Sequence, residues 1–284
     1  MKCLAHKKAG GRRNAGSSCA AKSGVQRAFT RLDLVVLIGL VVLLVSWIGL
    51  GRVGERGRMI RCAGNLAALG KAMHGYAKEH NGTLPAAGVS LGQTQSSWDM
   101  QVYPYLNPGV DKSDNDRLAK TIPQFFVCPS DKAPHQGKPR SYAMGGNDMT
   151  PEHWPPGRDS ATGVGLWWDR RTVLSLLDED ALKTPETLPA VRLSDVPFPA
   201  DTVLLAEFVD PNNTMAGTRQ ASVLGTSQQR QFFKDGGAKF HRGQFNYLMV
   251  DGHAEYLSPN ETLGRTNRTG LTIQSGMWTI LAGD

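Results

Sequence analysis

The residues best suited to chemistry lie near the C-terminus. They are His241, Asp251 and His253, and the aspartate is followed by Gly252. Imidazole and carboxylate groups bind zinc, and catalytic zinc sites use three protein ligands. His241 could reach Asp251 only if the chain folds back, whereas an Asp-Gly pair already has a sufficient role as a turn. We therefore expect structural roles for His241, Asp251 and Gly252, with no metal and no cofactor bound.

We identify no catalytic motif elsewhere in the sequence. The His-Glu-x-x-His of zinc peptidases is absent. Gly88-Val-Ser-Leu-Gly92 and Gly49-Leu-Gly-Arg-Val-Gly54 have the letters of the hydrolase and dinucleotide-loop patterns, but each pattern is a signal only between a strand and a helix, a context that the sequence does not predict here. The expected protein is therefore not an enzyme. One alternative is a ligand-binding module in which Trp167 and Trp168 form a sugar platform. A second alternative is a metal-dependent enzyme built on His241, Asp251 and His253.

Charge separates the N-terminus from the rest of the chain. The 284 residues carry a formal net charge of +7. Residues 1–28 alone hold seven Lys and Arg and no acidic residue, so the remainder is close to neutral. A nucleic-acid surface would need a basic patch or stripe in the folded part. We therefore expect no nucleic-acid partner.

An apolar run without charges extends from Leu34 to Leu50, directly after this basic leader. A membrane-spanning helix needs about 17 to 25 mostly apolar residues, and basic residues beside a span stay in the cytoplasm. The sequence predicts a leader over 1–28, a transmembrane helix over 29–50 and an extracytoplasmic C-terminal part. Asp33 lies just inside the span, where a carboxylate is costly and usually functional.

Elements of an α+β fold follow the span. Apolar residues at steps of three and four predict an amphipathic helix over 51–82, ended by Asn81-Gly82. Residues 201–209 are apolar and β-branched, and Asp-Gly between 244–250 and 253–257 predicts a hairpin. The expected fold is a long N-terminal helix, half membrane span and half amphipathic, packed on an antiparallel sheet. Loop-rich insertions complete the sheet domain over 83–284.

Four cysteines divide between the leader and the exported part. Cys3 and Cys19 lie in the leader, which leaves Cys62 and Cys128 in a compartment where disulfides persist. A bridge between these two would close a loop of 66 positions, worth about 4 kcal/mol in the chain-entropy model. The alternative is two unpaired buried thiols, since spacing alone does not show that the Cβ atoms meet.

The N-terminal arrangement resembles the signal of type IV prepilins. Those proteins have a basic leader, a small residue at the cleavage point, and then Phe-Thr-Leu-Ile-Glu before an apolar helix. The corresponding residues here are Ala28 and then Phe29-Thr-Arg31-Leu-Asp33. Ala28 replaces the usual Gly, Arg31 replaces an apolar residue and Asp33 replaces Glu with its charge kept. An uncleaved signal anchor is the alternative.

The C-terminus resembles the same group of proteins. His241, nine residues and then Asp251-Gly252 match the H-x9-DG signature of many bacterial prepilin-like proteins. Further similar pieces occur between the two ends, so the resemblance covers most of the chain; they are Cys62-Ala-Gly-Asn-Leu66, Phe126-Val-Cys-Pro-Ser-Asp131 and Thr202-Val-Leu-Leu-Ala-Glu207.

The resemblance implies a pseudopilin-like structural subunit of a pilus-like or type II secretion-like apparatus. Its partners would be a prepilin peptidase, sister subunits and the inner membrane. Cleavage between Ala28 and Phe29 would leave Phe29 as the methylated N-terminus. Asp33 would then pair with that amine on a neighbouring subunit during assembly.

Overall fold

The computed structural model describes residues 30–92, 94–106, 124–146, 163–218, 220–263 and 276–280. The chain divides into two compact units, residues 1–49 and 50–284, and each is considered by itself. The expected leader, with the Ala28–Phe29 junction and the leader cysteines, lies outside the described residues.

The first unit contains the N-terminal part of helix α1 (Arg31–Glu79). The Asp33 carboxylate accepts hydrogen bonds from the Thr30 amide at 3.0 Å and the Thr30 hydroxyl at 2.8 Å. The Asp33 amide in turn donates to the Thr30 hydroxyl at 3.2 Å. This reciprocal pattern is a capping box, which supplies partners for amides that the first helical turn leaves free.

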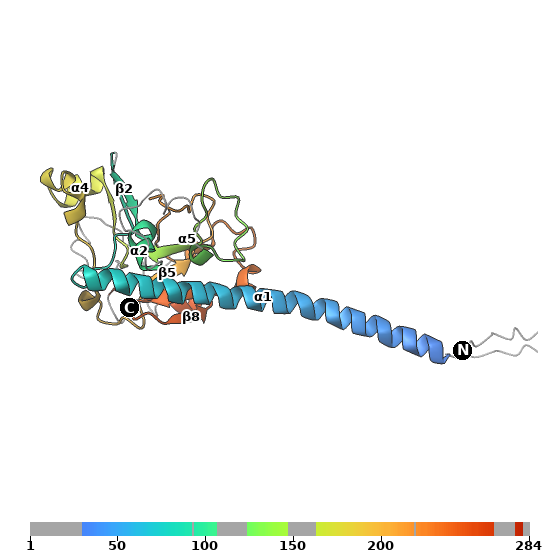
Figure 1. The fold of residues 1–284 in the computed structure, drawn as a ribbon. Coiled ribbons are helices and arrows are strands. Elements are labelled where there is room, and N and C mark those ends of the chain that lie inside the picture. Colours follow the sequence, from blue (N-terminus) through green and yellow to red (C-terminus); the bar gives the residue numbers. More distant parts are fainter. Residues whose placement is uncertain are drawn as a thin grey trace, which may run out of the picture. The chain divides into compact units, whose positions relative to one another are not determined.

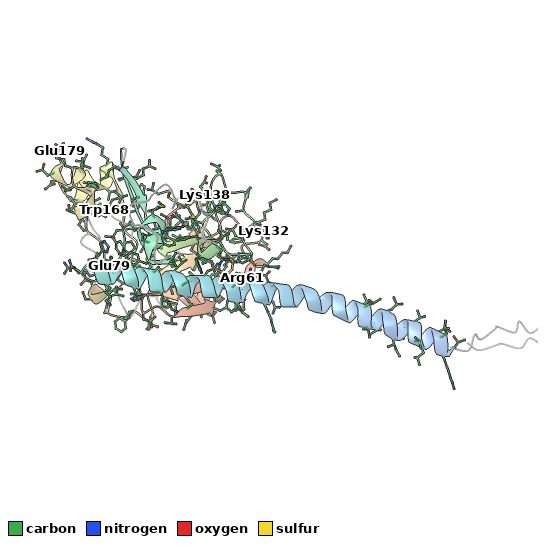
Figure 2. All side chains as sticks on the ribbon, in the orientation of Figure 1. Arg61, Glu79, Lys132, Lys138, Trp168 and Glu179 are labelled. Atoms are coloured by element: carbon green, nitrogen blue, oxygen red, sulfur yellow. A yellow bond between two sulfur atoms is a disulfide. The ribbon has the colours of Figure 1, made fainter. Side chains whose placement is uncertain are left out.

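Apolar side chains after this cap stand out from α1 on all sides (Figure 2). Those from Leu34 to Leu44 are 51% to 68% exposed. No helix among the described residues is long and apolar enough to cross a membrane. The predicted membrane-spanning half of the N-terminal helix is thus not found in this part of the chain.

In the second unit, α1 buries one stripe of its surface. Cys62, Leu66, Leu69 and Met73 are fully buried, and their steps of four, three and four place them on one helix face. Gly70 continues this face opposite the sheet, where an added Cβ would lie 2.9 Å from Leu248. The missing side chain therefore allows the helix to approach the sheet closely.

The described strands of the second unit form two sheets. The smaller has the strand order β2-β1-β4, with β1 and β2 antiparallel and β1 and β4 parallel. Its strands are β1 (Gly88–Leu91), β2 (Thr94–Ser97) and β4 (Trp167–Asp169).

The larger sheet has the order β6-β3-β5-β7-β8, and Figure 1 labels β5 and β8 beside the C-terminal part of α1. Its strands are β3 (Tyr142–Gly145), β5 (Val203–Glu207), β6 (Ser222–Val223), β7 (Phe245–Met249) and β8 (Ala254–Leu257). Neighbouring strands pair antiparallel except β3 and β6, which are parallel. Its three central strands are fully buried.

The predicted antiparallel sheet is therefore wrong, because both sheets are mixed. Parallel neighbours need a crossover of a dozen or more residues, and the stretches between β1 and β4 and between β3 and β6 provide such crossovers. Strands of two to four residues are too short to show an alternating pattern. The part of the 83–284 domain that precedes β5, where we expected loop-rich insertions, thus contributes β1 to β4.

The remaining helices are short. Those in the α conformation are α2 (Trp98–Leu106), α4 (Arg170–Leu176) and α5 (Thr226–Arg230). Single 3-10 turns connect the elements; they are η1 (Gln124–Phe126), η3 (Asp180–Leu182), η4 (Pro185–Thr187), η5 (Leu193–Asp195), η6 (Phe240–Gly243), η7 (Pro259–Thr262) and η8 (Gly276–Trp278).

A buried ion pair links α2 to the segment that enters β3. The Arg140 guanidinium donates to the Asp99 carboxylate, and both side chains are completely buried. Arg140 also donates to Asn213 at 2.7 Å and lies 5.5 Å from the centre of the Trp98 ring. Removing one partner of such a buried pair typically costs about 3 to 5 kcal/mol, because the other charge is left uncompensated.

The turn between β7 and β8 depends on Gly252. Its φ is +96°, a conformation that side chains with a Cβ rarely adopt, and its amide donates to Met249 at 2.9 Å. The Asp251 carboxylate accepts the His253 amide at 3.0 Å. The hairpin predicted from Asp251-Gly252 thus has its strands at β7 and β8.

We predict that Gly252→Val lowers the free energy of unfolding by about 1 to 3 kcal/mol, because it forces a β-branched residue into a strained backbone region. Gly57→Val is the matched control, since Gly57 is an exposed helical residue with open space around its Cα and valine is no worse than glycine in a helix. Denaturant unfolding of both variants measures the difference. Equal stability of Gly252→Val and wild type would contradict this account of the turn.

Candidate functional site

His241 is the centre of a buried polar cluster. The turn η6 places it just before β7 and buries its side chain completely. His241 and Arg242 both have positive φ, at 42° and 64°. Such conformations cost about 1 to 3 kcal/mol each and persist only where surrounding contacts hold them.

Both ring nitrogens of His241 contact carboxylates. Nδ1 lies 2.8 Å from Glu55 Oε1 on α1, and Nε2 lies 3.1 Å from Glu207 Oε1 at the end of β5. A carboxylate can only accept, so each nitrogen must carry a proton when both acids are ionised. The imidazole is then a cation held between two anions.

The pKa of His241 reflects two opposing effects. Burial alone lowers it, but the hydrogen bonds and charges of Glu207 and Glu55 outweigh burial and raise the pKa above 6.5. Burial likewise raises the pKa of Glu55, yet hydrogen bonds from Arg58, His241 and Ser130 outweigh it and lower the pKa. The charged forms of the pair are therefore favoured together.

Further contacts hold the two acids in place. Glu207 accepts the Asn246 amide at 2.8 Å and the Asn246 side chain at 2.9 Å. Glu55 accepts the Ser130 hydroxyl at 2.9 Å and Arg58 Nε at 2.9 Å. The Tyr256 hydroxyl donates to the His241 carbonyl. Each carboxylate is thus held by further hydrogen bonds besides its contact with His241.

A disulfide bond joins Cys62 on α1 to Cys128, which follows η1. Both cysteines are fully buried, and Cys128 Sγ lies 3.3 Å from His241 Nε2. Close by, the Tyr142 hydroxyl donates to the Cys62 carbonyl at 3.3 Å. The bridge and the charged cluster therefore form one continuous interior site.

The structure does not bring His241 to the other two residues that the sequence grouped with it. Among the described residues, Asp251 and His253 pair with each other at 2.6 Å, at the exposed hairpin turn. The partners of His241 are instead Glu55, Glu207 and Cys128. The alternative of an enzyme centre built from His241, Asp251 and His253 thus lacks the required geometry.

Two members of the site were missed in the sequence. Glu207 ends an otherwise apolar strand, and a charge in such a position is a usable signal for a buried polar site. Glu55 lies among glycines and arginines at 51–61, and no feature of the sequence distinguishes it from an ordinary surface charge.

The tryptophans proposed as a sugar platform do not share an open face. Trp168 is fully buried and its indole donates to the Pro189 carbonyl at 2.9 Å, and Figure 2 labels it within the packed part of the second unit. A cavity of about 850 Å³ is lined by Tyr76, Gln101 and Arg192 among others, and neither Trp167 nor Trp168 contributes to it.

Comparisons with known proteins give no match: no family model fits the chain, and neither the curated proteins nor the solved structures contain a significant relative.

We predict that His241 stabilises the oxidised protein most at acidic to neutral pH. Its folded-state pKa is raised, so its contribution is complete below 6.5 and is lost as the pH rises through the folded value. The difference in unfolding free energy between wild type and His241→Gln should therefore shrink as the pH rises above 6.5 and through the folded-state pKa, as measured by denaturant unfolding.

His253→Gln is the comparison variant. The pKa of His253 is raised as well, against burial, by Asp251 and Glu255, but its side chain is 39% exposed and solvent screens the pair. Its effect on stability should be smaller at every pH. A pH-independent difference for His241→Gln would contradict an imidazolium between Glu55 and Glu207.

Proposed function

We propose that the chain is a pseudopilin-like structural subunit of a pilus-like or type II secretion-like apparatus. In this proposal a prepilin peptidase removes the leader, Phe29 becomes the methylated N-terminus, and sister subunits assemble through their N-terminal segments. The observation that carries the proposal is the row of exposed apolar side chains from Leu34 to Leu44, directly after Asp33.

Burial of these exposed apolar side chains away from water would be favourable. Fully burying one Val, Leu or Ile side chain is worth about 1.5 to 3 kcal/mol, and most residues from Leu34 to Leu44 are of this kind. A membrane and the matching segments of sister subunits would both supply apolar surroundings. The protein would then lie at the inner membrane, with a cytoplasmic N-terminus and an extracytoplasmic C-terminal domain.

Asp33 would provide the specific contact in assembly. Its carboxylate caps the first turn of α1 through Thr30. A carboxylate has about four lone-pair sites, so capping leaves acceptor capacity for a further donor. The amine of Phe29 on a neighbouring subunit is the donor that the prepilin resemblance implies, and Phe29 lies outside the described residues.

A structural role also fits the interior site. The charged groups around His241 are buried and already satisfied by Glu55, Glu207 and Asn246. The disulfide between Cys62 and Cys128 suits an oxidising, extracytoplasmic compartment. These features support a domain built to be stable outside the cytoplasm, and we propose no enzymatic activity for it.

The experiment compares wild type and Asp33→Ala by cross-linking between subunits. Both proteins carry one added cysteine, Val36→Cys, at an exposed position of α1. Intact-mass analysis of membrane-extracted protein first establishes whether the chain begins at Phe29. We predict equal membrane content and at least about a fivefold loss of cross-linked dimer in Asp33→Ala, the change expected from losing roughly 1 kcal/mol. Removal of the acid would leave the neighbouring amine unpaired in apolar surroundings.

Asp33→Glu is the matched control, because it keeps the carboxylate and should keep the cross-links. Equal cross-linking in wild type and Asp33→Ala, with the leader removed, would contradict assembly through Asp33. A chain that retains Met1 would contradict processing by a prepilin peptidase and leave the signal-anchor interpretation.

A further inference from the structure

Four metal-ligating side chains from distant parts of the chain meet in the interior of the second unit. They are Cys62 of α1, Cys128 after η1, Glu207 of β5 and His241 of η6. All four are buried, and their donor atoms lie within 4.8 Å of one another. We propose that, when the Cys62–Cys128 bond is reduced, these residues bind one zinc ion as a closed structural site.

The spacing of the donors suits a tetrahedral ion. With Zn–S bonds near 2.3 Å and Zn–N and Zn–O bonds near 2.0 Å, neighbouring donors lie about 3.3 to 3.8 Å apart. His241 Nε2 lies 3.3 Å from Cys128 Sγ and 3.1 Å from Glu207 Oε1. The two sulfurs are the donors that must separate, and breaking the bond between them frees them to do so.

Surrounding contacts orient the ligands for metal binding. Zinc-bound histidines usually donate their other ring nitrogen to a carboxylate, which fixes the tautomer. Nδ1 of His241 has such a partner in Glu55 at 2.8 Å, so Nε2 is the nitrogen turned toward the sulfurs. Asn246 holds Glu207 through two hydrogen bonds. The zinc ion would take the place of the Nε2 proton.

The donor set selects the kind of ion. Two thiolates, one imidazole and one carboxylate suit zinc, whereas calcium and magnesium take oxygen ligands. Four protein donors leave no open position for water or substrate, which is typical of structural zinc sites. Three negative ligands and a divalent ion leave one net negative charge in the interior.

Formation of the site is a balanced exchange. A dithiol reductant gives two electrons and two protons to the Cys62–Cys128 bond and becomes a disulfide itself. Zinc then binds both sulfurs as thiolates and displaces their two protons, together with the Nε2 proton. The bridge and the metal use the same atoms and exclude each other, and either one ties α1 to the segment after η1.

We place the ion's route to the ring in a cavity that His241 helps to line. This cavity of about 320 Å³ is lined by His241, Glu55, Met59, Arg242 and Tyr256, together with Arg56 and Gln244. Glu55 is partly exposed there, with 21% of its side chain accessible. The carboxylate that orients the ring thus also faces the side from which a cation would enter.

The test uses the full chain with both leader cysteines replaced (Cys3→Ser, Cys19→Ser), reduced with a phosphine and titrated with cobalt(II). Tetrahedral thiolate coordination produces intense visible d–d bands and a sulfur-to-cobalt charge-transfer band. We expect these bands at one cobalt per chain in the reduced protein, none in the oxidised protein, and their loss when zinc is added. A reduced, folded chain without these bands would overturn the proposal.

Single variants distinguish the residues that bind the metal from the residue that orients a ligand. His241→Gln should abolish the bands, and Glu55→Gln should weaken cobalt binding about 10- to 100-fold, as expected for a residue that orients a ligand. His253→Gln, at the exposed turn, is the control and should bind as wild type does. If Glu55→Gln and His241→Gln both bound cobalt with wild-type affinity, the assignment of these ligands would be overturned.

One measurement does not depend on any variant folding. X-ray absorption at the zinc edge of the reduced wild-type chain should give two sulfur and two nitrogen or oxygen neighbours. If reduction itself unfolds the protein, zinc should restore the folded circular-dichroism spectrum, because metal binding then supplies folding free energy. All-oxygen coordination, or failure to refold with zinc, would contradict the site.

Discussion

The packing of α1 on the larger sheet depends on one buried imidazole between two carboxylates. His241 reaches Glu55 across 186 positions of sequence and Glu207 across 34. The charges compensate one another in the interior, where an isolated charge would cost several kcal/mol. Because the three residues come from α1, β5 and η6, the contact fixes the helix, the central strand and the turn before β7 together.

The disulfide also stabilises the packing of α1 in the domain. It links Cys62 to the segment after η1, next to the imidazole. Hydrophobic packing then spreads along the stripe formed by Leu66, Leu69 and Met73, and Gly70 permits close contact with β7.

Features with a local cause could be predicted from the sequence. Asp251-Gly252 predicts its hairpin because a turn with positive φ favours glycine, and the spacing of Leu66, Leu69 and Met73 predicts a buried helix face. Features that depend on distant partners could not. The parallel pairs β1–β4 and β3–β6 join short strands across long crossovers, and such strands carry no periodic pattern of their own.

The interior site shows the same division. His241 stood out in the sequence, but the neighbours first considered for it were the nearby Asp251 and His253. Its actual partners, Glu55 and Glu207, are far away along the chain, and only the folded structure brings them together. Glu207 had a weak signal as a charge ending an apolar strand, and Glu55 had none.

A double-mutant cycle between Glu55 and His241 tests most directly whether this contact holds α1 to the sheet. Unfolding free energies of Glu55→Gln, His241→Gln and the double variant, measured near pH 6 with the disulfide intact, give the coupling between the two side chains. We predict a favourable coupling of about 1 to 3 kcal/mol, as found for residues in one ionic network. Additive effects within about 0.5 kcal/mol would contradict the claim.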